Sequence, residues 1–273
     1  MARSAWRGFI VAALSGLLIA GAAAADDSPL PERRLSLRAE TDMPGGDLTQ
    51  IFDTTLQACI QACAGNAECK ALTYNERARA CFPKGDAGAP APFAGAVSGY
   101  AVAPTPERIA RAIARAAAAT PFIGADDLTA ARTQAGTLAA MQPALPAAAS
   151  DDRAEVRKLE YDGNPQEAAQ RLASYVARDD NAQDWVDLAR LTARNAEAGN
   201  SEAANSVLQM AINGYLRATE DGVAAQALLY LAQADDQLDR GRDGLSALRL
   251  AQRLSPDNPD IAAALDQSEA RNG

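Results

Sequence analysis

The residues best suited to chemistry are the four cysteines of this 273-residue chain, all of which lie between Cys59 and Cys81. Their spacing is C-x3-C-x5-C-x11-C. Four thiols this close together can form two disulfides or bind zinc. Cysteine zinc sites are usually built from paired C-x2-C knuckles, which this spacing lacks. The pattern therefore predicts a small disulfide framework, which is typical of exported proteins.

The chain contains no histidine. This absence excludes Ser-His-Asp and Cys-His nucleophilic sites, histidine acid–base catalysis and zinc sites that need imidazole. Carboxylate or lysine chemistry stays open, but we find no phosphate-cradling glycine loop and no G-x-S-x-G motif. We therefore predict that the chain is not an enzyme and that it holds neither a cofactor nor a metal ion.

A helix is expected to carry the first two cysteines, because residues 54–64 have helical composition. Thr54 or Thr55 can cap its beginning, and Gly65-Asn66 can end it. Cys59 and Cys63 would then lie four positions apart on one face of the helix.

Side chains on one face suit two bridges to another element better than one bridge to each other. The partners of Cys59 and Cys63 are then Cys69 and Cys81. Residues 70–74 and 79–82 each predict a strand, with a hairpin turn between them.

Together these features resemble the PAN/Apple family. The matching residues are Asp47-Leu48, the four cysteines, Ala71-Leu72-Thr73-Tyr74-Asn75 and Cys81-Phe82-Pro83-Lys84. The resemblance implies a curled antiparallel sheet with one helix across it, and disulfides Cys59–Cys81 and Cys63–Cys69. It also implies a module that binds a protein or carbohydrate ligand and does no chemistry. The outer cysteine pair of the full family pattern is absent, and we expect Tyr74 and Phe82 in the core.

The first 25 residues have the order of a signal peptide. Arg3 and Arg7 precede an apolar run from Gly8 to Ala20, and a small-residue stretch follows it. We expect cleavage between Ala22 and Asp26 and an exported protein, periplasmic or secreted, without stable membrane insertion. An uncleaved anchor helix is the alternative.

Charge limits the partners of the mature chain. Without the two leader arginines, the mature chain has 24 of the 26 basic side chains and 35 acidic side chains, which gives a net charge of −11. Phosphate binding requires a basic surface, so nucleic acid is not an expected partner.

The composition after the predicted module, residues 30–103, changes to alanine-rich helix. Residues 104–149 form a helical linker, in which Ile109, Ile113 and Ala117 recur at helical spacing and residues 128–141 give a second helix. This pair of helices is expected as either a packed hairpin or a loose spacer.

Residues 150–273 resemble degenerate tetratricopeptide repeats. Turn signals at 163–165, 198–200 and 240–242 place successive glycines 36 and 42 residues apart, near the 34-residue period of helix–turn–helix units. The larger gap predicts elongated helices or a longer loop near residues 214–222. Tyr175, Trp185 and Tyr230 are expected in the core, and a peptide or a further domain is the expected partner of the repeats.

The predicted fold class is therefore α+β, a small disulfide-bonded antiparallel sheet with one helix, followed by an all-α repeat domain. This order resembles the N-terminal region of bacterial alpha-2-macroglobulin-family proteins, as do the stretches 213–219 and 265–273. The resemblance implies a non-catalytic interaction segment of a periplasmic protease inhibitor, without its bait and thioester regions. The alternative is a freestanding exported adaptor that binds a protein or carbohydrate.

Overall fold

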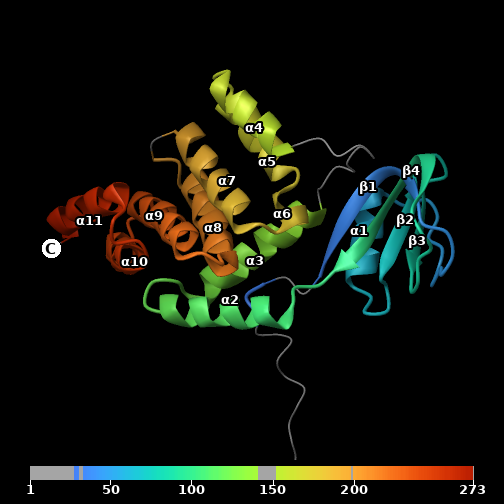
Figure 1. Cartoon of the computed structure of the whole chain (residues 1–273), viewed down its shortest axis with the longest axis horizontal. Helices are drawn as coiled ribbons and strands as arrows, with labels where there is room; N and C mark the ends of the chain where they lie inside the picture. Colours follow the sequence, from blue (N-terminus) through green and yellow to red (C-terminus); the bar gives the residue numbers. More distant parts are fainter. Residues whose placement is uncertain (1–27, 31–32, 141–151, 198, 273) are drawn as a thin grey trace, which may run out of the picture.

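The computed structural model describes residues 28–30, 33–140, 152–197 and 199–272. The expected signal peptide and its cleavage site lie outside these residues. A small β-rich unit and a longer helical unit lie side by side along the long axis, with the C-terminus at the end of the helical unit (Figure 1). The predicted fold class, a disulfide-bonded sheet with one helix followed by an all-helical region, is confirmed.

The β-rich unit is an antiparallel sheet of four strands in the order β1-β4-β2-β3. One helix, α1, covers one face of the sheet. The bounds of these elements are β1 Arg34–Asp42, α1 Leu56–Ala64, β2 Ala71–Asn75, β3 Ala80–Lys84 and β4 Ala91–Val102.

Local signals set the ends of α1. The hydroxyl of Thr55 accepts a hydrogen bond from the Ala58 amide at 3.2 Å, and Gly65 forms the C-terminal cap. Of the two threonines expected as caps, the structure uses the second. Below the helix, Leu35, Leu37, Leu72 and Val97 form a closed core with the cysteines.

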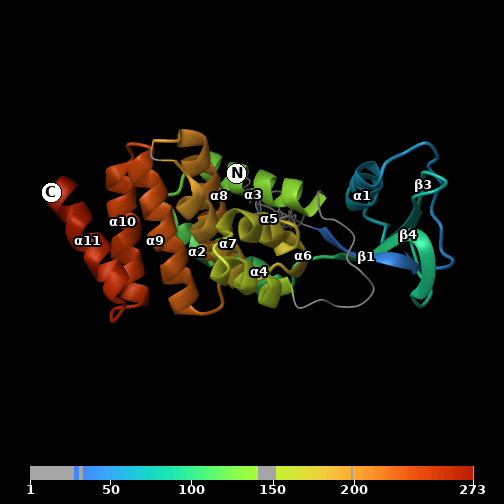
Figure 2. The ribbon, with the colours of Figure 1, turned by 90° about the horizontal axis from the view of Figure 1, so that it is seen from above.

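The helical unit continues directly from β4. Its helices are α2 Pro106–Ala119, α3 Ala125–Ala140, α4 Asp152–Tyr161, α5 Pro165–Ala173, α6 Val176–Asp179, α7 Ala182–Asn195, α8 Ser201–Arg217, α9 Asp221–Gln237, α10 Gly241–Leu254 and α11 Pro259–Asn272. Helices α7 to α11 pack in sequence along the long axis, as Figure 2 shows from above.

The wide spacing between the last two glycine turns comes from long helices. Helices α8 and α9 have 17 residues each and are joined by a short link, so no long loop is present there. Gly214 lies inside α8, where an added Cβ would approach the Val186 side chain to 2.9 Å. The glycine therefore permits α7 and α8 to pack closely.

The helices α2 and α3 are not a loose spacer, because both arms of this hairpin pack against α8, although they make few contacts with each other. Their alanines join the main helical core, and the Asn213 amide of α8 donates a hydrogen bond to the Ala131 carbonyl at 2.8 Å. The expected apolar stripe is wrong in part, because Ile113 and Ala117 are exposed, whereas Ala112 and Ala119 are buried. Alanine on the buried face permits a close approach to α8, and the larger isoleucine is left outside.

A short segment before β1 also belongs to the helical core. Leu30 is 1% exposed and packs in the same cluster as Ala112, Ala119 and Phe122. In the described part of the chain, residues 28–30 therefore lie with the helices, β1 to β4 form the sheet, and the helices continue after β4.

The aromatic residues expected in the repeat core lie there. Trp185 and Tyr175 are fully buried, and Tyr230 is partly buried against the main cluster. At the C-terminal end, α11 covers α10 through Ile261 and Leu265.

Candidate ligand-binding site

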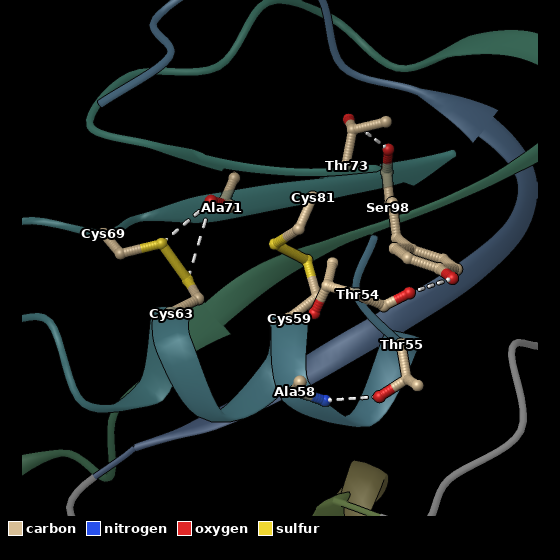
Figure 3. The surroundings of a disulfide bond; sticks show 11 residues. Thr54, Thr55, Ala58, Cys59, Cys63, Cys69, Ala71, Thr73, Cys81 and Ser98 are labelled. Carbon is tan, nitrogen blue, oxygen red and sulfur yellow. Dashed lines mark hydrogen bonds between the residues drawn. A yellow bond between two sulfur atoms is a disulfide. The ribbon is translucent and has the colours of Figure 1, made fainter. Parts of the chain in front are cut away.

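Both disulfides fix α1 to its neighbours. Cys59 is bonded to Cys81, 22 positions away, and Cys63 is bonded to Cys69, six positions away, as the PAN/Apple resemblance implies (Figure 3). All four side chains are fully buried, and none of the four is a free thiol. The cysteines therefore act as structural bridges and offer no reactive sulfur.

The helix α1 and its disulfides cover the middle of one side of the sheet. Tyr74 is buried on this side, and its hydroxyl donates a hydrogen bond to the Thr54 carbonyl at 3.0 Å, just before α1. A hollow on this side lies at the edge of α1, against α3, and has a volume of about 340 Å³. The opposite face of the sheet is not covered by α1.

The opposite face holds a pocket with a volume of about 310 Å³. The loop after β1 forms one wall, and β2, β3 and the start of β4 form the floor and the other wall. The lining residues are Asp42, Pro44, Gly45, Asp47, Thr73, Asn75, Phe82, Lys84, Phe93 and Ala96. This volume is near the lower end of the range of small-ligand sites.

Polar contacts hold the loop wall of the pocket in place. The Lys84 ammonium, whose side chain is 4% exposed, donates to the Asp47 carboxylate and to the Gly45 carbonyl. The Met43 amide donates to the Thr73 hydroxyl at 3.2 Å. Because these contacts within the chain hold the wall, little ordering would be needed on binding.

One glycine is required for this loop to close. Gly46 has φ +69°, and an added Cβ would lie 1.6 Å from the Asp86 carbonyl oxygen. The preceding residue of the loop, Gly45, also has a positive φ. Any side chain at Gly46 would push the loop away from the segment after β3.

Aromatic and polar groups stand together in the pocket. Phe93 is 50% exposed, and Phe82 is half-buried with the Lys84 ammonium 5.9 Å from its ring centroid. Asn75 and the carboxylates of Asp42 and Asp47 supply hydrogen-bonding groups. This set can pack against a ring and bind hydroxyl groups.

The charged groups of Lys84 and Asp47 in the pocket are held in contacts within the chain. Among the residues that the structure describes, no group of three or more cysteine, aspartate or glutamate side chains is placed to hold a metal ion. The pocket contains carboxylates and a lysine, but the lysine is already engaged by Asp47. The arrangement supports binding of a ligand.

The prediction that Phe82 lies in the core is wrong, because its side chain is half-buried and lines the pocket. Cys81 and Pro83 face α1, so Phe82 and Lys84 face the pocket, as the two-residue alternation of a strand requires. Applied to C-F-P-K, this alternation could have identified Phe82. Phe93 carried no such signal, because it lies outside the motif.

Within the described part of the chain, no helix is both long and apolar enough to cross a membrane. A disulfide-bonded module of this size is typical of secreted proteins.

Comparison with curated proteins gives no match to the chain. The family model of the PAN domain matches residues 37–100, which cover most of the sheet, α1 and all four cysteines. We conclude that the β-rich unit of this chain is a PAN domain, a module that binds proteins or carbohydrates.

Proposed function

We propose that this chain is an exported, non-catalytic binding protein. Its PAN domain binds a carbohydrate in the pocket on the face of the sheet opposite α1. The observation that carries this proposal is the half-exposed Phe93 ring beside the polar groups of Asp42 and Asn75 in a preformed hollow. Aromatic faces carry partial negative charge, so the C–H face of a sugar ring can pack on them. The neighbouring amide and carboxylates can bind sugar hydroxyls.

The pocket favours a carbohydrate over a protein ligand. A stable protein interface buries about 800 Å² on each partner, with an apolar centre. The large apolar side chains exposed on the PAN domain are Leu48, Phe52, Phe93 and Tyr100. Of these, the pocket includes Phe93 alone, and five of its other nine lining residues are polar or charged.

We propose that the helical unit is a degenerate tetratricopeptide-like stack that carries the PAN domain. The packing of each helix against the next, α7 on α8, α8 on α9 and α9 on α10, supports this assignment. The order of modules also supports a role as the leading segment of a periplasmic alpha-2-macroglobulin-like protease inhibitor. The size of the native protein in its source cells tests that role, since a species much larger than 28.4 kDa is expected.

A glycan array probed with the secreted full chain tests the carbohydrate proposal. We expect selective binding to a small set of glycans. Phe93→Ala should weaken that binding by about tenfold, which corresponds to about 1.4 kcal/mol. Tyr161→Ala is the matched control, because Tyr161 is an exposed aromatic residue of the helical unit.

Two outcomes would contradict this assignment. Equal loss of binding in both variants would remove the pocket from the interaction. Failure to bind any glycan, together with capture of a defined protein that Phe93→Ala releases, would make the ligand a protein.

A further inference from the structure

Three carboxylates share one arginine where the α2–α3 hairpin meets the turn between α9 and α10. The Arg240 guanidinium donates two hydrogen bonds to Asp127, both 3.0 Å long, and its Nε donates to Asp243 at 3.3 Å. The same Nε lies 3.2 Å from an oxygen of Asp235. One positive charge therefore faces three carboxylates.

Asp235 is the unusual member of this cluster. It is 0% exposed, and neither of its carboxylate oxygens accepts a hydrogen bond. A buried, ionised carboxylate without hydrogen bonds is strongly unfavourable. A proton on Asp235 would remove this charge and leave Arg240 facing two carboxylates, Asp127 and Asp243, in place of three.

We infer that Asp235 is a proton-binding site and that the joint between the α2–α3 hairpin and the last helices tightens on acidification. The joint depends on Arg240, which also donates to the Phe122 carbonyl in the α2–α3 link at 3.3 Å. Ionisation of Asp235 adds a third negative charge beneath this arginine. The charge favours opening of the turn, which lets water reach the carboxylate.

The surrounding charges support this assignment. Burial raises the pKa of Asp235 to about 7, with further increases from Asp243, Asp127 and Asp236 and opposition from Arg240. Asp236 is itself paired with Arg271 of α11.

Composition makes the effect observable. Histidine is the one side chain whose ordinary pKa falls between pH 5 and 8, and this chain has none. The pKa of Asp235 is higher in the folded chain than in the unfolded chain. Below about pH 4, Asp235 is protonated in both the folded and the unfolded chain, and the stabilisation from this proton is fully present. The advantage of the folded state is then lost as the pH rises from about 4 to about 7.

Carbon-13 NMR of the aspartate carboxyl groups in the full mature chain tests the inference. Asp235→Asn, which mimics the protonated form, identifies the Asp235 resonance by its disappearance. We expect a midpoint between pH 6 and 8. A midpoint below pH 5 would overturn the proposal.

Hydrogen exchange tests the link to the joint and does not depend on ligand binding. Division of the measured exchange rates by the intrinsic rates gives the equilibrium constant for opening. At the Leu238, Arg240 and Gly244 amides, this constant should increase up to about tenfold per pH unit between pH 5 and 7. Asp235→Asn should remove this dependence. Asp187→Asn is the control, because burial also raises the pKa of Asp187 but it lies on α7. Equal pH dependence in wild type and Asp235→Asn would place the effect elsewhere and refute the coupling.

Discussion

Arg34, the first residue of β1, forms an ion pair with Asp180, in the turn before α7, at 3.4 Å. Asp180 also pairs with Arg108 of α2 at 2.7 Å and with Arg217 of α8. Its side chain is 8% exposed, so water screens these contacts poorly. One carboxylate therefore connects the PAN domain to two helices of the helical unit.

Removal of this carboxylate should destabilise the whole chain. Asp180→Ala would deprive three guanidinium groups of a shared partner, and Arg217 is fully buried over the Trp185 ring. Loss of one member of a buried pair costs about 3–5 kcal/mol. Chemical denaturation should report a loss of this size.

The matched control for this change is Asp221→Ala. Asp221 pairs with Arg115 at 3.5 Å but is largely exposed, so its loss should cost less than about 1 kcal/mol. An equal loss of unfolding free energy in the two variants would mean that the Asp180 contacts stabilise the chain no more than an exposed ion pair does.

The two disulfides should differ in their contribution to the PAN domain. Replacement of Cys59 and Cys81 by serine opens a loop of 22 positions, and replacement of Cys63 and Cys69 opens one of six. The chain-entropy relation gives about 3 and about 2 kcal/mol, respectively. Non-reducing peptide mapping checks the pairing, and urea unfolding checks the order. A greater loss from the shorter loop would contradict the prediction.

Trp185→Ala should weaken the helical unit. Trp185 is fully buried among Tyr175, Leu188 and Leu191, so its truncation should cost about 3–5 kcal/mol. Circular dichroism of the full chain measures the loss. Tyr161→Ala removes an exposed aromatic ring as the control, and a similar fall in melting temperature there would argue against a core role for Trp185.

Leu30→Ala should destabilise the helices and spare the PAN domain. Leu30 precedes the sheet in sequence but is buried in the helical core, so we expect a cost of about 2–5 kcal/mol. Hydrogen exchange should increase in α2 and α3 and stay unchanged in β2. Leu48→Ala, at a half-exposed site of the PAN domain, is the control. Loss of protection in the sheet instead would show that Leu30 supports the other unit.

Local patterns were enough to predict the PAN domain. Cys59 and Cys63 lie one helical turn apart, and the alternating strands with a turn between them set the frame for the bridges. The glycine turns near 163 and 199 likewise marked the links between helices correctly, because they depend on the conformation of a few adjacent residues.

Which face of the alanine-rich α2 is buried could not be read from the sequence. Alanine occurs on several of its faces, so periodicity gives little contrast, and the larger Ile113 drew attention to a face that the structure leaves exposed. The contact with α8 decided the orientation.

Only the tertiary structure placed Asp127 beside Arg240, 113 positions away, and gathered Arg34, Arg108 and Arg217 on Asp180. In the sequence these residues look like ordinary charges on helix surfaces. Their energetic weight depends on burial and on distance to a counter-charge, and both arise only when segments far apart in the chain pack together.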